Sequence, residues 1–107
     1  MKKIVVGITG ASGSIYAVRL IDVLCEQGIE VHAVITDSGR CVLDYECGVT
    51  MEELARRVDV LYPNDDVGAA IASGSFRMDA MVILPCSMKT AGAIAHGVTE
   101  DLLTRAA

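Results

Sequence analysis

The fold is decided by a stretch near the start of the chain, residues 4–16, which reads Ile-Val-Val-Gly-Ile-Thr-Gly-Ala-Ser-Gly-Ser-Ile-Tyr. Its first part is apolar and rich in β-branched residues, a composition typical of a buried parallel strand. Small residues follow at 9–13, and an apolar-periodic helix begins near Ser14. Small side chains let a ligand approach the backbone, and a helix N-terminus offers unpaired N–H groups and a partial positive charge. This first turn is therefore predicted to bind a nucleotide-like phosphate.

The rest of the chain continues the alternation of strands and helices. Its order, β-α-β-α-α-β-α-β-α-α, predicts an α/β fold with a doubly wound, mainly parallel sheet of the Rossmann or flavodoxin-like kind. We expect a single domain over residues 1–107, and interpret it as the N-terminal portion of a longer domain, truncated at its C-terminus, because only four strands are found and nothing stops the last helical pattern. The predicted strands are 4–8, 30–35, 60–62 and 80–84. The first three predicted helices span residues 15–27, a segment that is capped by Asp37 or Ser38 and ends at 45, and residues 51–58. A helical turn then begins at Asp65-Asp66, a further helix ends at His96, and a last helix is capped by Thr99.

Composition excludes several classes of function. The chain is 52% apolar with a net charge of −5, and without a basic stripe we expect no nucleic-acid partner. No apolar run reaches the ~18 residues that a membrane span needs, and no signal peptide is recognisable, so we expect a cytoplasmic protein without a membrane partner.

The four cysteines have no disulfide or metal-ligand spacing, which predicts reduced, mostly buried thiols and no metal site. They are Cys25, Cys41, Cys47 and Cys86.

The first turn leaves more than one ligand open. The dinucleotide fingerprint G-x-G-x-x-G is absent, but residues 9–15 resemble the phosphate-binding turn of extended short-chain dehydrogenases, which bind NAD(P). Those proteins have a glycine where this chain has Tyr16, and a tyrosine there suits a mononucleotide better. Asp37, after the second strand, could still bind a ribose. A tight turn that binds nothing is the structural alternative.

A second motif follows the last predicted strand. Residues 85–90 read Pro-Cys-Ser-Met-Lys-Thr, and open α/β sheets place their ligand-binding loops after the strands. The hydroxyls of Ser87 and Thr90, the loop amides and the Lys89 cation would suit a polar ring edge and a ribityl-phosphate chain. The same residues could also be a capped helix start with a solvated lysine.

Four motifs together resemble, in order and spacing, the flavin prenyltransferase family of the UbiX type, over the whole chain. They are Gly10-Ala11-Ser12-Gly13, Ala72-Ser73-Gly74-Ser75-Phe76, the run at 85–90, and Leu102-Leu103-Thr104-Arg105-Ala106-Ala107. The resemblance implies an FMN-binding enzyme that joins a dimethylallyl group from dimethylallyl phosphate to flavin N5 and C6. It also implies a homo-oligomer whose prenylated FMN is used by a UbiD-type decarboxylase.

By match of motif, the resemblance assigns roles to particular residues. Ser12 and Glu46 would be the catalytic residues. Ser12 would lie near flavin N5, and Glu46 would be the acid/base beside the reacting carbons, since closing the C6 bond requires loss of a ring proton. Arg105 would be shared between FMN and the allylic phosphate. The flavin-binding residues implied are Gly10, Ala11, Ser12, Thr36, Ser87, Met88, Lys89, Thr90 and Arg105.

The sequence also departs from this family. Its members continue past residue 107 with further segments that complete the phosphate site, so the 107-residue segment alone is predicted to be incomplete as a catalyst. A non-catalytic FMN-binding oligomeric module and an NAD(P)-binding, dehydrogenase-like protein are the alternatives that the sequence leaves open.

Overall fold

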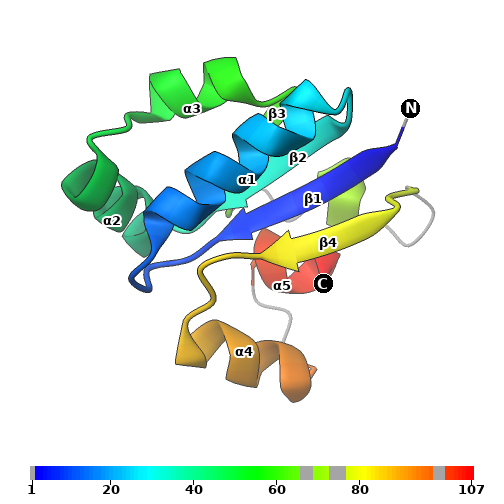
Figure 1. Cartoon of the computed structure of the whole chain (residues 1–107). Helices are drawn as coiled ribbons and strands as arrows, with labels where there is room; N and C mark the ends of the chain where they lie inside the picture. Colours follow the sequence, from blue (N-terminus) through cyan, green and yellow to red (C-terminus); the bar gives the residue numbers. More distant parts are fainter. Residues whose placement is uncertain (1, 66–68, 73–76, 98–100) are drawn as a thin grey trace.

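The computed structural model describes residues 2–65, 69–72, 77–97 and 101–107. Within these ranges the elements alternate as predicted, and each predicted strand is found within a residue or two of its expected bounds (Figure 1). The strands are β1 (Lys3–Ile8), β2 (Glu30–Ile35), β3 (Val60–Pro63) and β4 (Ala80–Ile83). The helices are α1 (Ser14–Glu26), α2 (Asp37–Cys47), α3 (Met51–Arg57), the 3-10 turn η1 (Ala70–Ala72), α4 (Met88–Ala95) and α5 (Leu102–Ala106).

The strands form one parallel sheet in the order β3-β2-β1-β4. The chain moves outward from β1 through β2 to β3, then crosses back to place β4 on the other side of β1. This reversal of direction puts a topological switch point between β1 and β4. In open α/β sheets, ligands bind outside the carboxyl ends of the strands at such a point, so the topology directs attention to the loops after β1 and β4.

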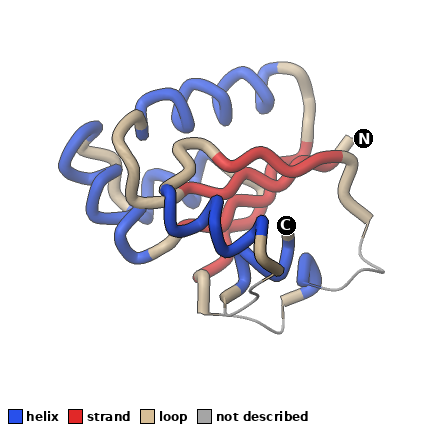
Figure 2. The backbone as a smooth tube through the Cα atoms, turned by 90° about the horizontal axis from the view of Figure 1, so that it is seen from below, coloured by secondary structure: helices blue, strands red, loops and turns tan. Residues whose placement is uncertain are grey.

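Helices cover both faces of the sheet, which confirms the doubly wound prediction (Figures 1 and 2). Successive residues of a strand point to opposite faces, and neighbouring valines of β1 divide accordingly. Val6 packs in a core with residues of α1, α2 and α3, whereas Val5 packs in a second core with Leu102 and Leu103 of α5 and Ile71 of η1. The two cores place α1, α2 and α3 against one face of the sheet and α5 and η1 against the other.

Helix caps refine the predicted boundaries. Thr50 caps α3 as expected, accepting a hydrogen bond from the Glu53 amide at 3.2 Å. At α2, however, the cap is Thr36 rather than Asp37 or Ser38. At α5 the cap is Asp101, where Thr99 was expected. The predicted positions Thr99, Glu100, Asp66 and the loop at 73–76 lie outside the described residues.

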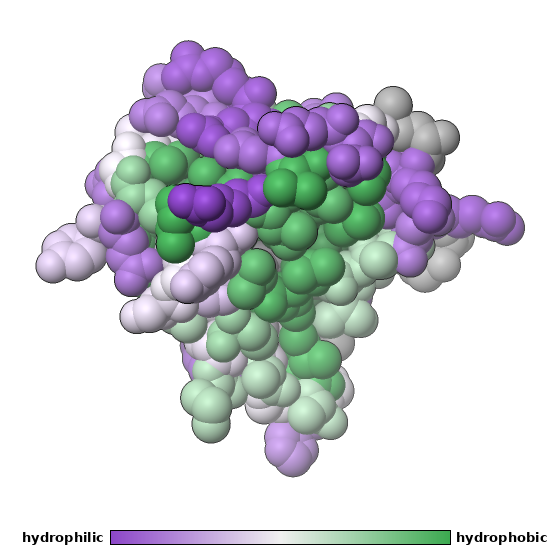
Figure 3. Space-filling model, in the orientation of Figure 1, coloured by the Kyte–Doolittle hydropathy of each residue, from purple (hydrophilic) through white to green (hydrophobic). Residues whose placement is uncertain are grey.

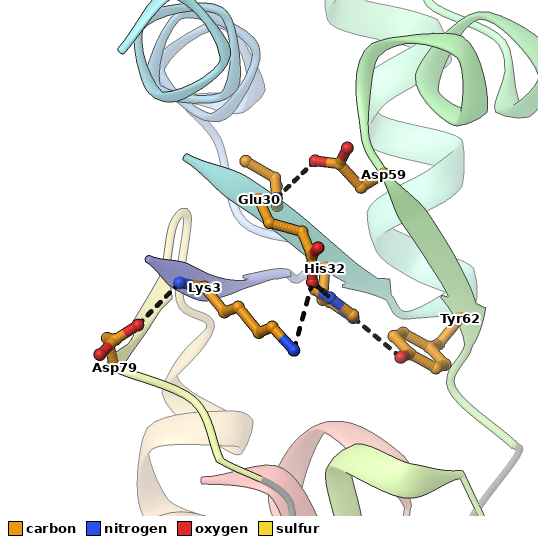
Figure 4. A network of polar contacts seen from close by, with 7 residues as sticks. Lys3, Glu30, His32, Asp59, Tyr62 and Asp79 are labelled. Carbon is orange, nitrogen blue, oxygen red and sulfur yellow. Dashed lines mark hydrogen bonds and ion pairs between the residues drawn. The ribbon is translucent and has the colours of Figure 1, made fainter. Parts of the chain in front are cut away.

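A polar network ties three strands together at the amino end of the sheet (Figure 4). The buried imidazole of His32 has Nε2 2.6 Å from Glu30 Oε2 and Nδ1 2.9 Å from the Tyr62 hydroxyl. Buried polar groups require such partners. Asp59 and Asp79 each accept a backbone N–H of the neighbouring strand at 2.7 Å. Strand pairing is thereby secured at the end of the sheet opposite to the loops that follow the strands.

Apolar surface remains exposed on one face. Figure 3 shows hydrophobic residues spread across the middle of the face that carries β1, β4 and α1. None of the four residues of β4 is buried, and α4 contributes no buried residue.

The cysteine prediction is wrong in one respect: all four thiols are free, but Cys25, Cys41 and Cys86 are exposed, because they lie on outward faces of helices or in a loop. No helix among the described residues is long and apolar enough to cross a membrane.

Candidate functional site

Three loops meet at the carboxyl edge of the sheet, after β1, β2 and β4. Gly10 in the first loop packs directly against Ser38 at the start of α2, because a Cβ atom on Gly10 would lie only 2.6 Å from the Ser38 Cβ. The first loop is bonded to the third as well, since the Thr9 amide donates to the carbonyl of Pro85 at 3.2 Å. The loops that the sequence singled out separately therefore form one surface.

Two adjoining hollows lie along this edge. The smaller one, about 240 Å³, is lined by residues of all three loops, and the larger one, about 480 Å³, extends beside β2 and β3. The larger volume falls within the range of about 300–1,000 Å³ typical of small-molecule sites. Both are lined by Thr36, Asp37, Asn64 and Asp101. The smaller hollow adds Thr9, Ser38, Ser87, Lys89 and Thr90, and the larger adds Ile35, Arg40, Met51, Pro63 and Asp65.

The loop after β4 is both a helix cap and part of the hollow. Ser87 caps α4 by accepting the Thr90 amide at 3.2 Å, and its hydroxyl donates to the Thr90 hydroxyl at 3.0 Å. The two interpretations of the sequence motif are therefore compatible. Lys89 supplies the cation of the smaller hollow, while Met88 points away, 91% exposed. The outcome is a rigid loop with hydroxyls and an ammonium group at one wall.

Glu46 reaches the first turn from α2. Its Oε1 accepts the backbone N–H groups of Gly13 and Ser14, each at 3.1 Å. A carboxylate at a helix N-terminus is stabilised by the orphan amides and the helix dipole. In this structure the protein's own carboxylate engages these two amides of the turn that is predicted to bind a phosphate, and the phosphate itself stays a prediction. The exposed Ser12 is next to this contact in the chain, so both residues predicted to be catalytic lie at one corner.

The acidic side of the hollows was missed by the sequence argument. Asp101 Oδ2 accepts a hydrogen bond from the Asn64 side chain at 2.7 Å, and Oδ1 accepts the Thr104 amide at 2.9 Å. Burial by itself would raise the pKa of Asp101, but the hydrogen bonds from Thr104 and Asn64 and the nearby Lys89 charge lower it below the usual value. Asp101 is therefore an anion in the neutral pH range. Its position three residues before Thr104 was the available signal, a capping pattern.

The structure brings together most, but not all, of the predicted binding residues. Thr36, Ser87, Lys89 and Thr90 line the smaller hollow, and Gly10, Ala11 and Ser12 form the adjoining first loop. Arg105 is exposed on α5 and is not among the residues that line either hollow. The predicted role of Arg105 stays a prediction without a contact in this structure.

The chain is similar in sequence to curated proteins. The chain is 47% identical over its full length to the flavin prenyltransferase UbiX of Escherichia coli, and 49% identical to the flavin prenyltransferase LpdB of Lactiplantibacillus plantarum. It spans 57% and 58% of the lengths of these two relatives.

Solved structures give the same result at the level of the fold. A crystal structure of AnUbiX in complex with FMN and dimethylallyl pyrophosphate matches with a TM-score of 0.96 at 33% identity, over 98% of this chain and 56% of that one. A dodecameric FMN-dependent UbiX-like decarboxylase from Escherichia coli matches with a TM-score of 0.94 at 36% identity, over 97% and 57%. The flavoprotein family model matches residues 1–107. The chain therefore belongs to the flavoprotein family.

Proposed function

We propose that the protein is a flavin prenyltransferase, which joins a dimethylallyl group from dimethylallyl phosphate or its pyrophosphate to N5 and C6 of FMN. The observation that carries this proposal is the meeting of the loops after β1, β2 and β4 around one hollow, with Glu46 held against the first of these loops by the amides of Gly13 and Ser14. The likeness to a structure that holds FMN and dimethylallyl pyrophosphate supports it, as does the identity to curated flavin prenyltransferases.

The residues present fit a flavin mononucleotide. Its ribityl and phosphate groups need hydrogen-bond donors and positive charge, which Thr36 after β2 and Ser87, Lys89 and Thr90 after β4 supply around the smaller hollow. Asp101 and Asn64 can accept and donate hydrogen bonds to the ribityl hydroxyls. A dinucleotide is less well suited, because the amides of Gly13 and Ser14 are engaged by Glu46 and Tyr16 stands where the dehydrogenase pattern has glycine.

The chain's own groups can perform the steps that this chemistry requires. When bound, the reduced flavin supplies the two nucleophilic atoms, N5 and C6. Glu46 is assigned as the acid/base. Its Oε1 is already held by two amides, so Oε2 would give a proton to the double bond of the transferred group as C6 bonds to it, and would then take up the proton that C6 loses. Lys89 stays assigned to the flavin, and the negative charge on a departing allylic phosphate is assigned to Arg105, as the family resemblance implies. Ser12 is assigned to the edge of the flavin near N5.

We further propose that the protein assembles into a homo-oligomer in the cytoplasm and delivers its product to a UbiD-type decarboxylase. The exposed apolar face over β1, β4 and α1 (Figure 3) is a surface that assembly would cover. A relative with 36% identity is described as dodecameric. Water exclusion by assembly would also suit a reaction that forms a water-sensitive allylic cation.

The experiment that tests flavin binding is a spectrum of the purified protein, followed by titration with FMN and, separately, with NADPH. A yellow preparation with flavin absorption, or saturable FMN binding, supports the proposal. Tight NADPH binding without any flavin affinity would favour the dehydrogenase alternative. Recovery of unchanged flavin after incubation of the reduced complex with dimethylallyl phosphate would identify a non-catalytic FMN-binding module.

A further inference from the structure

Thr9 is the buried link between the ends of β1 and β4. Its side chain is 1% exposed, and its hydroxyl makes two short hydrogen bonds across the switch point. The hydroxyl donates to the Pro85 carbonyl at 2.7 Å and accepts the Ser87 amide at 2.7 Å. The Thr9 amide donates to the same Pro85 carbonyl. Thr9 thus holds two backbone groups of the loop after β4, the carbonyl of Pro85 and the amide of Ser87.

These bonds continue where the regular pairing of strands stops. The last ladder bond on this side runs from the Leu84 amide to the Gly7 carbonyl at 2.9 Å. Beyond it, backbone groups of the loop lack strand partners and require others, because an unpaired buried polar group is costly. The Thr9 hydroxyl supplies the partner of the Ser87 amide, and Ser87 in turn caps α4 through Thr90.

We propose that Thr9 is a positioning residue for the flavin loop, holding Ser87, Lys89 and Thr90 at the wall of the hollow. This inference rests on the proposed function for its ligand, FMN. Thr9 lines the smaller hollow, but it is only 1% exposed and its hydroxyl is engaged by Pro85 and Ser87, so it acts on the site through the Ser87 amide. Its hydroxyl, rather than its size, is the property that the site requires.

Three variants of the purified protein separate this role from ordinary stability. Thr9→Val keeps the shape but removes both hydroxyl bonds, Thr9→Ser keeps the hydroxyl, and Val58→Ala loosens the core at the opposite edge of the sheet. The measurements are the FMN dissociation constant, the visible circular dichroism of the bound flavin and the melting temperature. Thr9→Val is expected to raise the dissociation constant about 10-fold or more and to change the flavin dichroism. Thr9→Ser is expected to restore both to within about 3-fold of wild type.

The control fixes the interpretation. Val58→Ala should lower the melting temperature while leaving the FMN dissociation constant unchanged. An equal loss of FMN affinity in Val58→Ala and Thr9→Val, or wild-type affinity and dichroism in Thr9→Val, would overturn the proposed role of Thr9. Neither outcome would contradict the proposed function. Absence of FMN binding by the wild type would instead contradict the proposed function.

A measurement on the unaltered protein covers the case in which Thr9→Val fails to fold. Exchange of the Ser87 amide hydrogen in the FMN complex should be slow, because the amide is held by a buried hydroxyl. Rapid exchange at Ser87, at the rate of the exposed loops, would overturn the proposal without any variant.

Discussion

Glu46 Oε1 lies 3.1 Å from the backbone nitrogen of Ser14, so the carboxylate of one helix closes the N-terminus of another. The contact joins residues 32 positions apart in the sequence. Oε1 is held by the amides of Gly13 and Ser14, and the proposed acid/base role of Glu46 therefore falls to Oε2. Gly13, whose amide makes the second of these hydrogen bonds, has a φ of 104°, a backbone conformation that favours glycine.

The first prediction separates the two functions of Glu46. Glu46→Gln keeps an oxygen acceptor for the amides but loses the basic carboxylate. We expect FMN affinity close to that of wild type and prenyl transfer slowed about 10²-fold or more, the usual scale of general acid–base loss. Single-turnover rates under saturating FMN and allylic phosphate provide the measurement. An unchanged rate would remove Glu46 from the catalytic residues.

The second prediction concerns the close approach of the first two loops. Gly10→Ala would place a Cβ 2.6 Å from Ser38 Cβ and 3.2 Å from its backbone carbonyl carbon, and overpacking of this kind costs about 1–3 kcal/mol of stability. Gly92→Ala is the matched control, because a Cβ there meets nothing within 4 Å and alanine is the better helix former by about 1 kcal/mol. Urea unfolding should therefore show the two variants shifting in opposite directions. Equal stability of Gly10→Ala and wild type would mean that the loops are not in contact.

The third prediction follows from the lowered pKa of Asp101. A carboxyl whose folded pKa is depressed contributes stability that is present above its unfolded pKa, about 3.9, and is lost as the pH falls through the folded value. Asp101→Asn retains a capping side chain but cannot titrate. The free energies of unfolding of wild type and Asp101→Asn should differ most above about pH 5 and converge in acid. A difference that stays constant from neutral to acid pH would contradict this account of Asp101.

The sequence was sufficient for the strands and for the class of site. The runs at 4–8 and 30–35 are apolar and β-branched, and such runs have few alternatives to a buried strand. The loop at 85–90 could be placed at the carboxyl edge because it follows a strand directly. These inferences depend on residues that are neighbours in the chain.

What the sequence could not provide depends on distances between remote segments or on a choice among equivalent residues. Thr36, Asp37 and Ser38 can all cap a helix, so local chemistry did not select Thr36. The occupation of the first turn by Glu46 became visible only once α2 was packed beside α1. The roles of Thr9 and Asp101 likewise arise from partners at Ser87 and Asn64, far away in the sequence.

The most direct test of the central claim is the mass of the flavin after reaction. The purified protein, loaded with FMN, reduced without oxygen and given dimethylallyl phosphate or pyrophosphate, is denatured, and the released flavin is analysed by mass spectrometry. We expect a flavin heavier by one five-carbon prenyl unit, formed with wild-type protein and nearly absent at the same time point with Glu46→Gln. Recovery of unmodified FMN from a fully loaded wild-type protein with both donors would contradict it.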